Sequence, residues 1–305
     1  MRSASVIERL LGSLGVVFGA VTLVFLILNW LPGDPAELIA GEDASEETVA
    51  QVRAQLGTAQ PLGTRYVRYI GGLLRGDLGQ SYVTREPVAK RLAAQFPATL
   101  KLTVLGCAVA VAVGVGLGVL SARHAGGWID QAVQAVALGL HSMPSFWLGI
   151  LLILLFSVTL GWLPVIGRSP AAMVLPVSAL GLVVSVPIMR MVRDGMLEGL
   201  HEPYVTTLRA KGLGEARIFY VHVLRNALIP TVTLLGLVVG ELLSGAVIIE
   251  TLYARQGIGR ITVEAIGQKD IPVVQGTILV AAVGFVVVNL LVDLSYTLID
   301  PRVRK

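Results

Sequence analysis

The run TLKLTVLGCAVAVAVGVGLGVLSA at residues 99–122 decides the fold class, because it is almost wholly apolar and long enough to cross a lipid bilayer. A membrane-spanning helix needs about 20 such residues. Small residues recur at every fourth position of this run, at Ala110, Gly114, Gly118 and Ala122. Such a stripe lets helix backbones approach closely. We therefore interpret these glycines, which lie inside a span, as helix-packing residues and not as a ligand-binding loop.

Other apolar runs of similar length surround this one. The six predicted spans lie near residues 9–31, 99–122, 132–160, 174–195, 229–251 and 273–297. Hydrophobic residues make up 54% of the 305 positions and charged residues only 14%, whereas soluble domains carry roughly a quarter charged residues. We predict an all-α membrane protein with six transmembrane helices. The first run is too long for a secretory signal and has no small-residue cleavage site, so we interpret it as a retained anchor.

Lysine and arginine residues in the short loops indicate the orientation, because cytosolic loops carry an excess of them. With the N-terminus inside, twelve of these residues face the cytosol and four face outward. The cytosolic set is Arg2, Arg9, Arg123, Arg190, Arg193, Arg209, Lys211, Arg217, Arg225, Arg302, Arg304 and Lys305, and the outer set is Arg168, Arg255, Arg260 and Lys269. Both termini are therefore predicted to be cytosolic. The sequence pI of about 9.4 then reflects topology and lipid headgroups, not nucleic-acid binding.

Residues 32–98 then lie outside the membrane and are expected to be helical. Asp43 or Ser45 can cap the first helix and Gly57 can end it. The three expected helices run over 46–56, from Pro61 to Gly76, and near 86–95. The segment is either a small cap packed on the membrane face or a docking surface or gate for an external partner.

Ionisable residues inside spans indicate function, because inserting each one into the membrane at a helix centre costs about 2.5–3.5 kcal/mol of free energy. Glu241 lies mid-span beside a stripe of small residues at Gly236, Gly240 and Ser244. We predict that Glu241 and Ser244 line an aqueous path through the bundle. Glu250, near the outer end of the same helix, belongs by default to the bundle interior or to an aqueous pathway.

Three further residues in predicted spans are singled out. Asp293 either faces the bundle interior or pairs structurally with a neighbouring polar group. Pro144 and Pro187 are expected to kink spans three and four.

The residue types that catalysis needs do not form a recognisable site. The histidines, at positions 124, 141, 201 and 222, show no metal-ligand spacing with one another or with acids. Cys107 is alone in an apolar run and is expected to serve packing, and no phosphate-binding Gly-x-x-x-x-Gly-Lys-Ser/Thr motif occurs. We therefore predict a chain that binds no metal or cofactor and is not an enzyme.

Between spans four and five lies a polar, basic segment at 202–230. Pro203 suits the first turn of a helix and Gly212 its termination. A second helix can start at Gly214 and run to Asn226, before Pro230 begins the next span. Membrane anchoring needs only a few basic residues and no glycine-broken hairpin. The segment therefore predicts a rigid contact with a cytosolic partner.

This segment resembles the cytoplasmic loop of bacterial ABC importer permeases, in the variant of the dipeptide, oligopeptide and nickel branch. Arg-Ala-Lys-Gly-Leu at 209–213 and His-x-Leu-Arg-Asn-Ala-Leu-Ile-Pro at 222–230 carry the resemblance. In the general pattern of such loops, a Glu-Ala-Ala triplet stands where this chain has Thr206-Thr207-Leu208. Five other stretches agree with the same branch, and these are LPGDP at 31–35, GDLGQS at 76–81, PSFWLG at 144–149, GWLP at 161–164 and DPR at 300–302.

The resemblance covers nearly the whole chain, as the first of two permeases in a type I importer of the bacterial inner membrane. It implies a heterodimer with a second homologous permease, two cytosolic ATPases that bind ATP and Mg²⁺, and an extracytoplasmic substrate-binding protein. Residues 1–98 would form the anchor and external segment, and 99–305 a five-helix core with a coupling loop at 196–229. The residues implied to contact the ATPase are Thr206, Thr207, Arg209, Ala210, Lys211, Gly212 and Leu213.

The substrate that the resemblance implies is a di- or oligopeptide. Nickel or another metal chelate, an opine and glutathione are alternatives within the same branch. A function of another class, ion-coupled secondary transport, would need intramembrane charges or inverted repeats, and neither stands out in this sequence. A purely structural scaffold would not need the glycine-broken hairpin.

Overall fold

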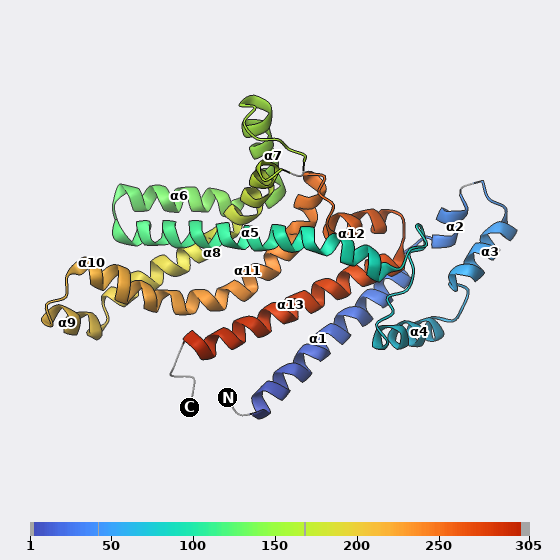
Figure 1. Cartoon of the computed structure of the whole chain (residues 1–305), viewed down its shortest axis with the longest axis horizontal. Coiled ribbons are helices and arrows are strands. Elements are labelled where there is room, and N and C mark those ends of the chain that lie inside the picture. Colours follow the sequence, from blue (N-terminus) through green and yellow to red (C-terminus); the bar gives the residue numbers. More distant parts are fainter. Residues whose placement is uncertain (1–2, 42, 168, 300–305) are drawn as a thin grey trace. The chain divides into compact units, whose positions relative to one another are not determined.

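The computed structural model describes residues 3–41, 43–167 and 169–299, with side chains over 11–292 except positions 42 and 168. Within these ranges the regular secondary structure is helical, apart from an isolated bridge between Gln80 and Pro87 (Figure 1). Five helices are long and apolar enough to cross a membrane, or six spans if one bent pair is counted. The all-α membrane fold predicted from composition is confirmed.

Some predictions fall outside the described residues. These are the 300–302 motif and the cations Arg2, Arg168, Arg302, Arg304 and Lys305. The side chains of Arg9 and Asp293 are also outside them. The roles predicted for these residues stay predictions.

The helices follow one another along the chain with short connections. They are α1 (Ser3–Trp30), α2 (Pro35–Ala40), α3 (Glu46–Leu56), α4 (Leu62–Leu74), α5 (Val88–Arg123), α6 (Trp128–Ser142), α7 (Ser145–Leu152), α8 (Ala171–Leu200), α9 (Pro203–Ala210), α10 (Glu215–Arg217), α11 (Leu224–Leu252), α12 (Ile258–Gly267) and α13 (Ile271–Ile299). Two π-helical turns, η1 (Ile153–Thr159) and η2 (Ile218–Val223), continue α7 and join α10 to α11.

Contacts divide the chain into two compact units. Unit 1 comprises residues 1–99 and 255–286, and unit 2 comprises residues 100–254 and 287–305. In unit 2, α8 supplies many of the buried core residues, and these pack with those of α11 and of the half of α5 in this unit.

The glycine stripe of α5 packs against α8, as predicted. A Cβ atom on Gly114 would lie 2.7 Å from the backbone oxygen of Ser185, and one on Gly118 would lie 2.8 Å from that of Met189. Any side chain at these two positions would therefore push the helices apart.

Two predicted helices have different boundaries in the structure. The separate helix expected near 86–95 is wrong, because α5 runs unbroken from Val88 through Pro97. Val88 and Leu92 are buried in the unit 1 core, and this packing holds the helix together despite the hydrogen bond that Pro97 removes. The expected end of the second hairpin helix at Asn226 is also wrong.

From Glu215 the chain is helical without interruption to Leu252, past Pro230. Ile218, Val223 and Ala227 are buried along this stretch. They extend the buried face of the span into the hairpin, so that one helix replaces the two that the sequence predicted.

The third predicted span, at 132–160, is not one helix. α6 ends at Ser142, α7 begins at Ser145, and the axes of α6 and of the α7–η1 stretch differ by 107°. Pro144 stands in this break, so the position of the bend was predicted correctly and its extent was not. α8 contains Pro187 without interruption.

The helices α3 and α4 of unit 1 begin and end close to the predicted residues. Ser45 Oγ accepts a hydrogen bond from the backbone N–H of Thr48 at 3.3 Å and so caps α3, and Gly57, with φ of +71°, ends it. Pro61 precedes α4, and Gly76 follows it with φ of +75°. The short helices α2 and α12 were not predicted.

Candidate functional site

The helix α9, where a partner contact is predicted, has one anchored face and one free face. Val205 is buried, and Tyr204 and Leu208 are half-buried against the core of unit 2. The predicted contact residues Thr206, Thr207, Arg209, Ala210, Lys211 and Gly212 are all exposed. In Figure 1, α9 and α10 form a short hairpin beyond the ends of α8 and α11.

Gly212 ends α9 in a Schellman turn. The backbone N–H of Leu213 donates to Leu208 O at 3.2 Å, and that of Gly212 donates to Arg209 O at 2.9 Å, which is the hydrogen-bond pattern of that motif. Gly212 has φ of +80°, a conformation that costs other residues about 1–2 kcal/mol. Leu213 is half-buried and packs on the core with Leu208. Leu213 therefore anchors the turn, and its predicted contact with a partner stays a prediction.

An ion pair crosses the same turn. Arg209 Nε and Nη2 donate to the two carboxylate oxygens of Glu215 at 2.7 and 3.1 Å. The hydrogen bonds to Glu215 raise the pKa of the Arg209 guanidinium. Arg209 is also among the residues predicted to contact the ATPase, and since this ion pair is exposed that contact stays a prediction. Among the described residues of α9 and α10, the exposed cations without such a partner are Lys211 and Arg217, and of these Lys211 belongs to the predicted contact set.

The base of the hairpin is packed onto neighbouring helices. The guanidinium of Arg123, at the end of α5, lies 5.7 Å from the ring centroid of Phe219 in η2, within the range of a cation–π contact. A Cβ atom on Gly199 would lie 3.1 Å from Val223. Force applied to α9 would therefore be passed to α8, α5 and α11 and not absorbed by a loose loop.

A buried ion pair that the sequence did not reveal joins three segments of unit 2. Arg193 on α8 donates from Nε and Nη2 to the two carboxylate oxygens of Asp130 on α6, both at 2.9 Å. Ser121 Oγ of α5, Gly126 N and Gln134 Nε2 also donate to this carboxylate, at 2.5, 2.9 and 3.0 Å. A buried carboxylate is tolerated when it is paired and its lone pairs are satisfied in this way.

A groove of about 440 Å³ contains both residues predicted to line the path. Glu241 and Ser244, on α11, share it with His141 and Ser145 at the α6–α7 break, and Leu180 of α8 forms part of its apolar wall. Both Glu241 and Ser244 are exposed. Glu250, further along α11, is 1% exposed and lies in the interior.

The α6–α7 break is held against α11 by close contacts. The hydroxyl of Tyr253 donates to Gly149 O at 3.0 Å. A Cβ atom on Gly149 would lie 2.7 Å from Leu252. The glycine thus lets α7 approach the end of α11.

In unit 1, Asp270 joins the start of α13 to the loop before α5. Its carboxylate accepts from Ser81 Oγ at 2.5 Å and from Tyr82 N at 2.9 Å, and Arg91 Nη1 lies 3.6 Å away. Asp270 is fully buried. This carboxylate links the two sequence segments that form unit 1.

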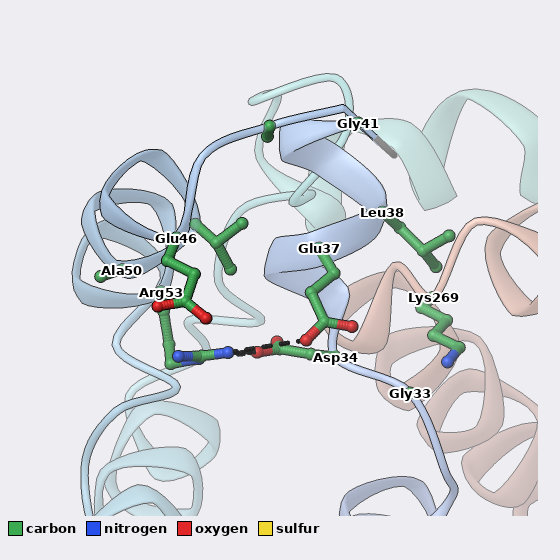
Figure 2. Close-up of a pocket in the computed structure, with 11 residues that line it drawn as sticks. Gly33, Asp34, Glu37, Leu38, Gly41, Glu46, Ala50, Arg53 and Lys269 are labelled. Carbon is green, nitrogen blue, oxygen red and sulfur yellow. Dashed lines mark hydrogen bonds and ion pairs between the residues drawn. The ribbon is translucent and has the colours of Figure 1, made fainter.

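A hollow of unit 1 lies between α2 and α3 and holds about 800 Å³ (Figure 2). Arg53 of α3 bonds to Asp34 through Nε at 2.6 Å and lies 3.8 Å from Glu37. Lys269 lies on the other side of Glu37 in this view (Figure 2), and its Nζ donates to Pro32 O at 2.7 Å. The hollow is open, polar and of mixed charge.

Comparison with known families assigns the chain to one of them. Residues 114–305 match the model of the binding-protein-dependent transport system inner membrane component, and residues 3–103 match the N-terminal model of the same kind of component. The chain belongs to this family. It is a membrane permease subunit, which is not itself an enzyme, and the sequence-based family assignment is confirmed.

Relatives of the permease match it from end to end. A Brucella melitensis protein, named as a candidate peptide transport system permease, is 40% identical over 313 residues and covers 100% of this chain and 99% of the relative. The glutathione transport system permease protein GsiC of Escherichia coli K12 is 41% identical over 300 residues and covers 98% of both chains.

The fold of the permease also has solved counterparts. A chain of the MetNI methionine ABC transporter, in an inward-facing conformation, superposes with a TM-score of 0.56 at 20% identity, covering 69% of this chain and 96% of that one. A second crystal form gives the same TM-score at 24% identity. This likeness supports the fold.

The motifs on which the resemblance rested have structural roles in the permease. In LPGDP, Asp34 caps α2 by accepting from Ala36 N at 2.9 Å. In GDLGQS, Ser81 bonds to Asp270. In PSFWLG, Gly149 meets α11, and in GWLP, Gly161 takes φ of +64°.

Two polar clusters escaped the sequence analysis of the permease. Asp130 and Arg193 each lie near the end of an apolar run. The sequence indicated a topological role for Arg193 and no role for Asp130. A charge close to a span needs a partner, and this is the signal that could have indicated the pair. Asp270 and Ser81 are 189 positions apart, and no local pattern links them.

Proposed function

We propose that this permease imports peptides in an ATP-driven complex and that α9 is the element on which a partner ATPase acts. The observation that carries the proposal is the division of α9 into two faces. Its apolar face is anchored through Val205 and Leu208, and its polar face is exposed and includes Thr206, Thr207 and Lys211. The ATPases would bind ATP and Mg²⁺, and the permease would bind neither.

The mechanism follows from this anchoring. Closure of two ATPases would press on α9, and the Schellman turn at Gly212 would keep the helix from bending away. The load would pass through Val223 and Phe219 to α8 and α5. The bundle would then alternate between inward-open and outward-open states.

The remaining partners of the permease are also proposals. A second homologous permease would complete the translocation path as a heterodimer, and an extracytoplasmic binding protein would deliver substrate. The hollow between α2 and α3 is a suitable docking surface for that protein, since it is open and polar. We retain the functional division into 1–98 and 99–305, with the coupling loop at 196–229.

The groove beside α11 is the proposed part of the path. Glu241 and Ser244 are its polar residues on that helix, and an intramembrane carboxylate exposed to a groove suits a cationic group such as a peptide amine. Peptides are preferred as substrate because the Brucella relative is named for peptide transport. Glutathione, itself a peptide, is the second candidate, because GsiC is named for it. A metal chelate and an opine have less support.

The test is uptake by the reconstituted complex. The permease, its partner permease and the ATPases are placed in liposomes with ATP inside, and the binding protein and labelled dipeptide, oligopeptide, glutathione or nickel chelate are added outside. We expect ATP-dependent uptake of a peptide. Uptake by the permease alone that a proton ionophore abolishes would identify a secondary transporter instead.

The α9 contact is tested in the same liposomes by charge reversal. Lys211→Glu places an acid on the proposed contact surface, and Arg217→Glu makes the same change at an exposed position of α10 in the same hairpin. We expect Lys211→Glu to lower ATPase stimulation and uptake several-fold more than Arg217→Glu. Equal effects of the two would count against α9 as the contact.

A further inference from the structure

A cavity of about 240 Å³ lies in unit 1, between the end of α1, the length of α4 and the start of α13. It is separate from the hollow between α2 and α3 and from the groove beside Glu241, and the proposed transport mechanism does not use it. Its lining is mostly polar or aromatic. Asn29, Arg65, Arg68, Tyr69 and Gln275 supply the groups discussed below.

The cavity has an excess of positive charge. Arg65 and Arg68 both line it, and neither forms an ion pair with any residue that the structure describes. Asp77 is the acid among the lining residues, and its Oδ1 already accepts from Gly79 N at 2.9 Å. Two guanidinium groups against one carboxylate leave the lining cationic, so it favours an anion.

Buried polar groups at the cavity lack partners inside the protein. Gln275 is 7% exposed as a whole residue, and its side chain makes no hydrogen bond with the described part of the chain. The hydroxyl oxygen of Tyr69 and Asn29 Oδ1 are buried and also unpaired. Asn29 Oδ1 is an acceptor, so a hydroxyl or ammonium group of a headgroup could satisfy it but the anion itself could not. Such atoms cost free energy unless something outside the chain satisfies them. Arg65, Tyr69 and Gln275 can all donate to an oxygen-rich anion.

The position of the cavity indicates the source of the anion. The apolar span of α1 ends at Trp30 and that of α13 begins at Ile271, so Asn29 and Gln275 lie where a span meets the headgroup layer. The flanking helix α4 exposes Val67 and Leu74, at 72% and 85%, as an interfacial helix does. At about 240 Å³ the cavity is smaller than the roughly 300–1,000 Å³ of pockets for drug-sized ligands.

We propose that this cavity binds the phosphate of a phospholipid headgroup, which Arg65 and Arg68 contact and the amide of Gln275 and the hydroxyl of Tyr69 orient. A bound phospholipid would hold α4 to the outer ends of α1 and α13 within unit 1. This gives the 32–98 segment a lipid-dependent role in addition to any contact with a binding protein.

The test is native mass spectrometry of the full-length permease with the subunits that co-purify with it. The purified protein is delipidated in a nonionic detergent and titrated with phosphatidylglycerol or with diacylglycerol, which has the same acyl chains and no phosphate. We expect saturable binding of phosphatidylglycerol and none of diacylglycerol at the same concentration. Equal binding of the two lipids would overturn the proposal.

The variants locate the site. Arg65→Gln with Arg68→Gln should weaken phosphatidylglycerol binding about tenfold or more, because each removes charge-assisted hydrogen bonds. Arg75→Gln is the matched control, since Arg75 is exposed at the end of the same helix and does not line the cavity. Equal loss in the control, or no loss in the double variant, would overturn the proposal.

Two further arms complete the test. Tyr69→Phe keeps the ring that stacks on Phe25 at 5.5 Å and lacks only the hydroxyl, so it applies even if the double variant is not recovered. We expect it to weaken binding several-fold, and unchanged binding would count against the site. Inorganic phosphate at millimolar concentration should not displace the lipid. Displacement would show that the cavity binds free phosphate and would overturn the lipid assignment.

Discussion

Arg193 on α8 and Asp130 on α6 face each other through two hydrogen bonds of 2.9 Å, and Ser121 of α5 adds a third donor to the same carboxylate. The Asp130 side chain is 3% exposed and that of Arg193 is 19% exposed. This pair therefore joins three helices of unit 2, with the carboxylate buried and the guanidinium partly exposed.

Asp130→Asn should destabilise the permease by roughly 3 kcal/mol, because it leaves a guanidinium without its buried partner. The measurement is the midpoint of thermal unfolding in detergent. Glu264→Gln, which removes one member of the exposed Arg260–Glu264 pair, should cost about 1 kcal/mol or less. A double variant with Asp130→Leu and Arg193→Met should recover part of the loss. If Asp130→Asn unfolds at the wild-type temperature, the pair is not structural.

Gly212→Ala should impair coupling where Gly214→Ala does not. Both glycines are exposed with open space around a Cβ, but Gly212 has φ of +80° and Gly214 has φ of −67°. Alanine at Gly212 costs about 1–2 kcal/mol of backbone strain and opens the Schellman turn. Stimulated ATPase activity per reconstituted complex is the measurement. Identical activity in the two variants would show that the turn does not matter for coupling.

Gly114→Ala should lower the thermal stability of the permease. Its Cβ would lie 2.7 Å from Ser185 O, and overpacking of this kind typically costs about 1–3 kcal/mol. Gly116→Ala lies on the same helix with nothing within 4 Å of its Cβ, so it should be neutral or stabilise by up to roughly 1 kcal/mol. The unfolding midpoints of the two variants are compared in one detergent. A loss confined to Gly114→Ala would show that close packing against α8, and not the loss of a glycine as such, lowers the stability.

Asp270→Asn should loosen the loop before α5. The carboxylate accepts from Ser81 Oγ and Tyr82 N, and hydrogen bonds to a charged group are worth about 1.5–3 kcal/mol. Hydrogen exchange at the Tyr82 amide should accelerate by at least about tenfold. Asp77→Asn, an exposed acid in the same loop, is the control. Unchanged protection of Tyr82 in Asp270→Asn would contradict the role assigned to Asp270.

Local signals account for the successful predictions. The Schellman turn at Gly212 and the cap at Ser45 depend on residues within a few positions of each other, so the sequence shows them directly. The errors at Pro97 and Pro230 have the opposite cause. At both positions, packing of buried side chains on neighbouring helices outweighs the hydrogen bond that a proline removes.

The sequence by itself determined the membrane class, the helical hairpin and its break, because hydropathy, helix period and glycine conformation are local properties. The tertiary structure decided which charges meet. Asp130 and Arg193 are 63 positions apart, and Ser81 and Asp270 are 189 apart. An ion pair depends on the register and crossing of packed helices, and these are set by the whole core and not by any single segment.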